Sequence, residues 1–214
     1  MRRWRSKLQS KWGMRLLWLV PLLSLVFETD LTALIWIGTT LIALIFVPAA
    51  RQATLAMVYR NVPLSLAIGT AIGGSLALLL DPWLEPALEA WTGSKIDLSQ
   101  LEKLPGDPGQ YVVWLILGMG FGGFWEELSF RGYFVGWGTK LFGNWTALPL
   151  TLGLALVFGA GHMYQDLPGA ISTGISGLIF GLTYLACDRK LLPAITAHAV
   201  ANFTGVTQIY LYGL

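Results

Sequence analysis

The feature that most constrains this fold is a series of long apolar runs separated by short polar segments. Of the 214 residues, 55% are hydrophobic and only 12% are charged, whereas soluble domains carry about 25% charged residues. A membrane-spanning helix needs about 20 apolar residues. The sequence therefore predicts an all-α fold, a polytopic transmembrane helical bundle of about seven spans. The runs cover residues 14–27, 31–48, 62–80, 111–125, 147–163, 168–187 and 191–211.

The fourth run is longer than a simple span requires. We expect its helix to continue to about residue 141, with a break near the acids at 126–127 as the alternative, which would make eight spans. Nothing in the composition marks a domain boundary. The prediction is a single integral membrane domain over residues 1–214, with the residues suited to chemistry between about 111 and 205.

Basic residues are distributed unevenly between the polar segments. In a seven-span arrangement, one side of the membrane receives residues 81–109, which carry six acids but only Lys95 and Lys103 as bases. Positive residues favour the cytoplasmic side, so the pattern predicts a cytoplasmic N-terminus, in what we expect to be the plasma membrane of a prokaryote. The other side receives eleven of the fourteen Lys/Arg, six of them within residues 1–15 and the others Arg51, Arg60, Lys140, Arg189 and Lys190.

The first apolar run follows a basic segment, as it would in a signal peptide. No small-residue cleavage site comes after it, because Glu28, Thr29 and Asp30 stand there. We therefore expect an uncleaved first span. The single cysteine, Cys187, excludes an intrachain disulfide and a cysteine-rich zinc site.

Two adjacent acids, Glu126 and Glu127, stand at the end of an apolar, glycine-rich stretch. A charged residue at the centre of a bilayer costs roughly 2.5–3.5 kcal/mol on insertion scales, so a carboxylate at that depth is a functional candidate. Both histidines of the chain, His162 and His198, also lie in apolar runs. Together these residues predict a buried hydrolytic site.

Helical spacing assigns different roles to the two glutamates. Glu127 and Arg131 are four residues apart and can pair, whereas Glu126 projects about 100° away from Glu127. The arginine then neutralises Glu127 and leaves Glu126 without a cation. A buried carboxylate in that situation is suited to proton transfer near neutral pH, so Glu126 is the candidate general base.

Two further pairs show the same four-residue spacing. His198 and Asn202 share one face of the last run, where imidazole and amide donors suit the stabilisation of an oxyanion. Phe158 and His162 share a face of an earlier run, which places an aromatic ring beside that histidine. The complete set could activate water and stabilise a tetrahedral intermediate.

These three spacings resemble the three motifs of the CPBP (Abi) family. Its members are the CAAX-processing and bacteriocin-processing intramembrane proteases, related to the Ras-converting CAAX endopeptidase. The matching positions lie within about 111–205 and occur in the family's order. They are Glu126-Glu127 with Arg131, Phe158 with His162, and His198 with Asn202.

The resemblance implies an all-helical fold and endopeptidase activity. It implies that Glu126 and His162 activate water, that His198 and Asn202 stabilise the oxyanion, and that Arg131 supports Glu127. We expect membrane lipids and a peptide or membrane-protein substrate as partners, and no nucleic acid. Nothing in the residues identifies a prenyl group on the substrate or an oligomeric state.

The sequence allows a metal-dependent and a metal-free mechanism, because the family that it resembles is also described as metalloproteases. Glu126, His162 and His198 could hold zinc with a free position for water. No His-Glu-x-x-His helix is present, and a carboxylate–imidazole pair activates water without a metal. The favoured interpretation has no cofactor, with zinc as the alternative.

Other functions compete with this interpretation. Ser176 lies in a Gly-Ile-Ser-Gly segment that resembles the serine motif of rhomboid proteases, with His198 as base. That interpretation leaves Glu126, Glu127 and His162 unexplained. A non-catalytic scaffold or bacteriocin-immunity protein, or a transporter with Glu126 as proton carrier, are the remaining alternatives.

The depth of the two histidines is a difficulty for the hydrolytic site. In straight spans, His162 would lie near the membrane boundary and His198 near the middle, roughly 9 Å apart in depth at about 1.5 Å per residue. A tilted span, a helix end at His162 or a wide aqueous cavity would close this gap.

Glycines at four-residue spacing recur along the apolar runs. Small residues at this spacing let helix backbones approach closely, and we expect packing within the chain rather than dimerisation. The pairs are Gly69/Gly73, Gly118/Gly122, Gly132/Gly136 and Gly177/Gly181.

Overall fold

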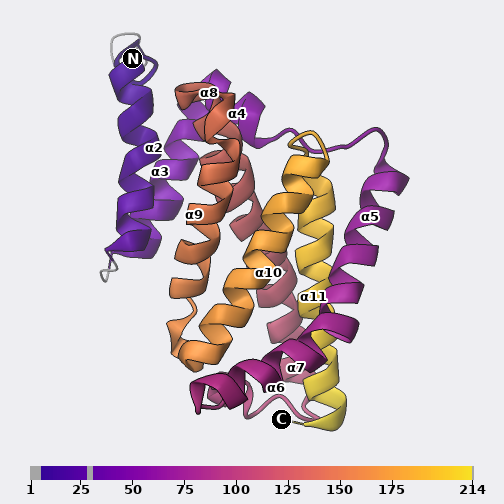
Figure 1. The fold of residues 1–214 in the computed structure, drawn as a ribbon. Helices are drawn as coiled ribbons and strands as arrows, with labels where there is room; N and C mark the ends of the chain where they lie inside the picture. Colours follow the sequence, from indigo (N-terminus) through magenta and orange to yellow (C-terminus); the bar gives the residue numbers. More distant parts are fainter. Residues whose placement is uncertain (1–5, 28–30, 214) are drawn as a thin grey trace.

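The described part of the chain is a bundle of helices (Figure 1). The computed structural model describes residues 6–27 and 31–213, and within them there is no strand. Arg2, Arg3 and Arg5 of the basic N-terminal segment, and residues 28–30 after the first run, lie outside the described residues. The longer helices are α2 (Lys11–Val26), α3 (Thr32–Phe46), α4 (Pro48–Thr54), α5 (Val62–Ser75), α6 (Asp81–Thr92), α7 (Pro108–Leu115), α8 (Gly138–Phe142), α9 (Ala147–Ala160), α10 (Asp166–Ala186) and α11 (Leu191–Tyr212).

Short 3-10 helices and π-helical segments connect or extend these α-helices. Each apolar run of the sequence is helical over most of its length, so the all-α prediction is confirmed for the described residues. The fourth run is helical from 108 to 142, without the break considered near the acids. The additional segments are η1 (Leu76–Leu80), η2 (Ser99–Leu101), η3 (Ile116–Glu126), η4 (Leu128–Trp137), η5 (Asn144–Thr146) and η6 (Met163–Gln165).

The number of membrane spans is not confirmed. By length and composition, two helices in the described residues qualify, Val62–Thr92 and Met163–Ala186. A third qualifies if α3 and α4, which meet at a bend of 110°, form one span. The seven-span count therefore stays a prediction. Helix α11 has 22 residues, but its polar site residues, His198 and Asn202, make it less apolar than a typical span.

The outer surface of the bundle is nevertheless apolar. Leu34 on α3 and Leu156 on α9 have 71% and 77% of their surface exposed, and many other large apolar side chains are exposed as well. Contiguous exposed apolar surface marks contact with a membrane or a partner. This surface fits a bundle surrounded by lipid.

The segment 81–109, treated as an outer loop in the sequence, is helical over its first part. Helix α6 continues from η1 and runs across the lower end of the bundle in Figure 1, where it packs against α10. It ends at Gly93, whose φ of 73° is the left-handed conformation that glycine adopts at helix ends. The segment thus covers one end of the bundle.

Helices α5 and α7 begin with side-chain caps. The Asn61 side chain accepts a hydrogen bond from the Leu64 N–H at the start of α5. The Asp107 side chain accepts from the backbone of Gly109 and Gln110 at the start of α7, with Pro108 as the first helical residue. The Asp107 cap fixes where the fourth run begins.

The fourth run is wound in wide π turns over η3 and η4, with only Glu127 between them assigned to an α turn. The π-helix is rare, and its usual single-turn form is frequent at functional sites. Every residue of η4 is buried. The main apolar core forms around it, and two hydrogen bonds fix α2 there, from the Trp18 indole to Phe134 O at 3.0 Å and from the Tyr133 hydroxyl to Leu17 O at 2.6 Å.

The paired glycines pack against other helices of the same chain, as predicted. A Cβ on Gly69 would lie 2.5 Å from Pro193 O on α11, and one on Gly73 would collide with Ala197 O. A Cβ on Gly177 would lie 2.8 Å from the Phe158 ring. Because glycine has no side chain, α5 can approach α11 closely at these positions, and α10 can approach α9.

Candidate active site

The predicted pair between Glu127 and Arg131 is present and buried. Arg131 Nη1 lies 2.6 Å from Glu127 Oε1, and the two side chains are 4% and 0% exposed. Arg131 also donates from Nη2 to the backbone oxygen of Gly177 on α10. Its guanidinium lies over the rings of Phe158 and Phe180, at 5.2 and 5.7 Å from their centroids. The cation is thus held between three helices.

His198 binds the same carboxylate, a contact that the spacing of the motifs does not indicate. His198 Nδ1 lies 2.9 Å from Glu127 Oε1. Since a carboxylate in an ion pair only accepts hydrogen bonds, Nδ1 carries the hydrogen and Nε2 is free for another partner. Phe180 stacks on the imidazole at 4.6 Å with an interplanar angle of 18°. Glu127 therefore orients His198 as well as neutralising Arg131.

His162 reaches the site because its helix ends before it. Helix α9 stops at Ala160, with Gly161 as its C-cap. The His162 ring turns back so that Nδ1 lies 2.8 Å from Phe158 O. A carbonyl only accepts, so Nδ1 donates and the ring presents Nε2 as an acceptor. Of the three ways to bring the histidines together, the structure uses a helix end at His162.

Phe158 links the two histidines. Its ring centroid is 4.8 Å from that of His162 and 6.0 Å from that of His198. Phe158 is also buried, with 3% of its surface exposed. The second motif therefore supplies a spacer that holds both imidazoles against one aromatic ring.

Asn202 is fixed to the fourth run. Its Nδ2 donates to Gly118 O at 2.7 Å, which leaves its second N–H for another acceptor. A Cβ on Gly122 would lie 2.7 Å from Asn202 Nδ2 and 3.5 Å from His198 Nε2. The absence of side chains at both glycines makes room for the polar groups of α11.

These residues face one cavity of about 1040 Å³, whose lining includes Glu126, His162, His198 and Asn202. Glu126 is half-buried, and no hydrogen bond or ion pair joins its side chain to another described residue. Its carboxylate lies within electrostatic range of His198. Glu127 does not line this cavity. The structure thus separates the two glutamates as the sequence predicts.

Tyr164 and Phe180 are further lining residues that sequence reasoning missed. The Tyr164 ring centroid lies 5.5 Å from that of His162, and Glu126 is within its electrostatic range. Both residues lie outside the four-residue spacings, so no motif pointed to them. The proximity of Tyr164 to His162 in the sequence was the one available signal.

The donor set does not fit the alternative metal site. Among residues 6–27 and 31–213, no three His, Cys, Asp or Glu side chains are grouped so that they could hold a metal ion. Glu126, His162 and His198 share the cavity without forming such a group.

Part of the chain is similar to a known protein family. Residues 108–204 match the family described as "Type II CAAX prenyl endopeptidase Rce1-like". The matched region is similar to an Rce1-like domain of the CPBP/CAAX protease family and covers less than half of the chain. This domain coincides with the region in which the three motifs lie, and its family is one of membrane-embedded proteases. No curated protein and no solved structure matches the chain significantly.

The geometry of the active-site cavity gives little support to the alternative of a rhomboid-like serine protease. Ser176 and His198 both line it, yet no hydrogen bond joins them in the described residues, and the imidazole is already bound to Glu127. A serine nucleophile is normally within hydrogen-bond reach of its base. Ser176 stays the less favoured nucleophile.

Proposed function

We propose that this chain is an intramembrane endopeptidase that hydrolyses a peptide bond with activated water in the cavity described above. The observation that carries the proposal is the separation of the two carboxylates. Glu127 is committed to Arg131 and His198, whereas Glu126 faces the cavity beside His162, His198 and Asn202. The similarity of residues 108–204 to a protease family supports the same reaction class.

Glu126 and His162 form the base side of the proposed site. The Glu126 carboxylate is free to accept a proton from water. The hydrogen bond from His162 Nδ1 to Phe158 O leaves Nε2 with a lone pair. A water between the two groups would lose a proton to Glu126 while Nε2 orients it. Glu126 then returns that proton to the amine that leaves.

His198 and Asn202 form the oxyanion side of the proposed site. His198 Nδ1 is already bound to Glu127 Oε1, so donation from Nε2 requires an imidazole with both nitrogens protonated. Asn202 adds the N–H that Gly118 O does not use. Both donors act on the charge that develops in the transition state.

The substrate is proposed as a peptide or the tail of a membrane protein. The outer part of the cavity is acidic, since Asp81, Glu85 and Asp97 line it while Lys95 is paired with Glu89 at 2.6 Å. A peptide with basic residues beside the cleaved bond fits this charge better than an acidic one.

The test is a cleavage assay on the purified chain in detergent, with and without Glu126→Ala. Two model peptides of equal length, one with lysines and one with glutamates beside the cleaved bond, serve as substrates. We expect wild-type protein to cut the basic peptide faster and Glu126→Ala to cut neither. Equal cleavage by wild type and variant would refute the proposed base. A wild-type protein that binds the peptides without cutting them would instead establish the scaffold alternative.

A further inference from the structure

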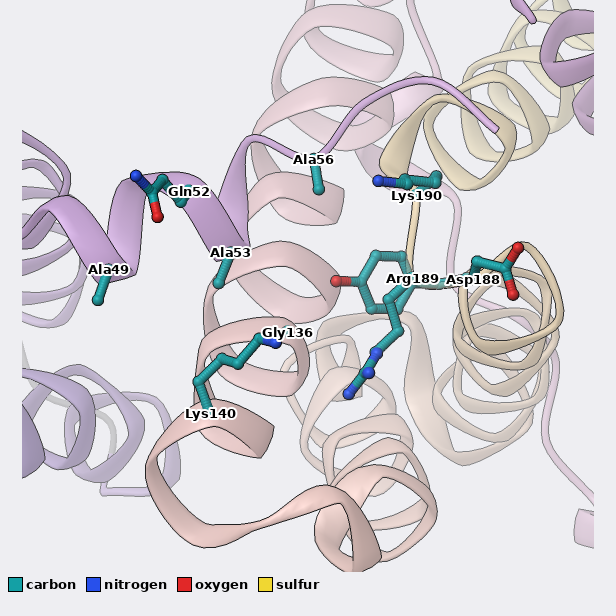
Figure 2. Close-up of a pocket in the computed structure, with 10 residues that line it drawn as sticks. Ala49, Gln52, Ala53, Ala56, Gly136, Lys140, Asp188, Arg189 and Lys190 are labelled. Atoms are coloured by element: carbon teal, nitrogen blue, oxygen red, sulfur yellow. The ribbon is translucent and has the colours of Figure 1, made fainter. Parts of the chain in front are cut away.

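A second cavity, of about 530 Å³, is shown in Figure 2. Its lining residues place it at the other end of the bundle from the candidate active site. Residues near the start of α10, such as Gly169, line the active-site cavity, whereas Tyr184 near its end lines the second one. The walls come from α4, η4, α8 and the turn between α10 and α11. No part of the proposed catalytic machinery lies here.

Three cations line this cavity, namely Lys140, Arg189 and Lys190. Figure 2 shows the amino groups of the two lysines pointing toward the middle of the view, while the carboxylate of Asp188 points away from it. Arg189 Nη1 is held by two neutral acceptors, Thr139 Oγ1 at 2.9 Å and Asn144 Oδ1 at 3.0 Å. Within the described residues no carboxylate pairs with any of the three. With Asp188 also in the lining, three cations and one carboxylate leave the cavity wall with a net positive charge.

A buried hydroxyl faces the same cavity. Tyr184 has none of its surface exposed, yet its hydroxyl has no hydrogen-bond partner among the described residues. Buried polar groups are nearly always paired, so an unpaired one needs an explanation. Gly136 lies in front of this hydroxyl, and a Cβ there would collide with it. The glycine thus leaves room for the hydroxyl beside η4.

The turn that carries two of the cations is held in an unusual conformation. Asp188 and Arg189 have φ values of 54° and 57°, the left-handed region that residues other than glycine seldom adopt. Hydrogen bonds from Arg189 N to Tyr184 O at 2.8 Å and from Leu191 N to Ala56 O at 2.9 Å hold the turn in place. Strained backbone of this kind is common at ligand clamps.

We propose that this cavity is a binding site for a phosphate group. Lys140, Arg189 and Lys190 supply its counter-charge, and the Tyr184 hydroxyl donates a hydrogen bond to a phosphate oxygen. Lys and Arg bind phosphate through charge-assisted hydrogen bonds. Basic pockets between the helices of membrane proteins, at the cytoplasmic surface, bind anionic lipid head groups. The phosphate therefore comes from the head group of such a lipid or from free phosphate.

The test measures binding by the purified full-length protein and needs no cleavage assay. Short-chain phosphatidylglycerol, short-chain phosphatidylcholine and inorganic phosphate are each titrated, with bound molecules counted by native mass spectrometry. The double variant Lys140→Gln/Lys190→Gln removes two cations, and Tyr184→Phe removes only the unpaired hydroxyl. The control Arg51→Gln/Arg60→Gln removes the same charge from positions outside the cavity.

Wild type and control should bind the phosphatidylglycerol, and the double lysine variant should bind it roughly 30-fold more weakly, because each basic residue near a charged lipid surface contributes a few-fold. Tyr184→Phe should weaken binding by roughly tenfold. Tight binding of inorganic phosphate with the same variant pattern would identify free phosphate as the source. Equal affinity in all four proteins, or an equal loss in the control, would overturn the site.

Discussion

Glu126 and Glu127 are adjacent in the sequence but have opposite surroundings. Glu127 is fully buried, and its Oε1 binds both Arg131 and His198, while its Oε2 has no partner among the described residues. Glu126 faces the cavity without a cation bound to it. A single step along the helix thus separates a structural carboxylate from the proposed base.

Substitution by glutamine distinguishes the two residues. Glu126→Gln keeps the shape and removes the base, so it should abolish cleavage and leave thermal stability nearly unchanged. Glu127→Gln leaves Arg131 without its carboxylate, and breaking a buried pair from one side typically costs about 3–5 kcal/mol. That variant should lose both stability and activity.

Thermal unfolding in detergent and turnover of a model peptide measure both effects. Each variant is the control for the other, because the two substitutions are chemically identical and one residue apart. The assignment fails if Glu126→Gln is the less stable protein, or if it cleaves at the wild-type rate.

Ser176 provides a second test at the scale of one residue. It lies on α10 in the same cavity as His198 but makes no hydrogen bond to it. Ser176→Ala should therefore retain most of the activity of wild type, measured with the same peptide. A folded but inactive variant, together with labelling of Ser176 by a fluorophosphonate, would favour the rhomboid-like mechanism instead.

At the scale of elements, the contact between η3 and α11 builds the proposed oxyanion side. Gly118 and Gly122 let the polar face of α11 reach the fourth run, so that Asn202 Nδ2 donates to Gly118 O at 2.7 Å. The wide turns of η3 carry these glycines and Glu126 on one continuous segment. Close packing of two helices thus sets the positions of three site residues.

A methyl group at Gly122 tests this contact. In Gly122→Ala the new Cβ would lie 2.7 Å from Asn202 Nδ2, so Asn202 must move and cleavage should fall steeply. Gly120→Ala is the matched control on the same segment, because nothing lies within 4 Å of its Cβ. Alanine is favoured over glycine in helices by up to about 1 kcal/mol, so the control should be as active as wild type and no less stable. Equal activity of the two variants would contradict the proposed role of the contact.

At the scale of the whole molecule, the two cavities lie at opposite ends of the bundle. The acidic segment 81–109, which includes α6, closes the end with the proposed active site. The turn from α10 to α11, with its bases, lies at the other end (Figure 1). This arrangement follows the uneven distribution of charge in the sequence. It places the active-site cavity toward the outer side in the predicted orientation.

Cysteine labelling tests that orientation. In a background in which Cys187 is replaced by alanine, single cysteines at Lys95 and Lys190 should react with an impermeant reagent from opposite sides of the membrane. The first should be accessible from outside and the second only after permeabilisation. Labelling of both from the same side would contradict the seven-span arrangement and its cytoplasmic N-terminus.

The sequence by itself determined the helical class, the approximate ends of each apolar run and the residues that share a face. These properties are local, because hydrophobic periodicity, capping residues and four-residue spacing act within one segment. The Glu127–Arg131 pair was predictable for the same reason, since both residues lie on one helical stretch.

Only the tertiary structure decided which faces meet. The hydrogen bond from His198 to Glu127 joins residues 71 positions apart, and the end of α9 brings His162 to the ring that also contacts His198. The phosphate-binding cavity likewise combines α4, α8 and the turn after α10. Spacing within one helix cannot specify such contacts, because they depend on how the helices pack and where each of them ends.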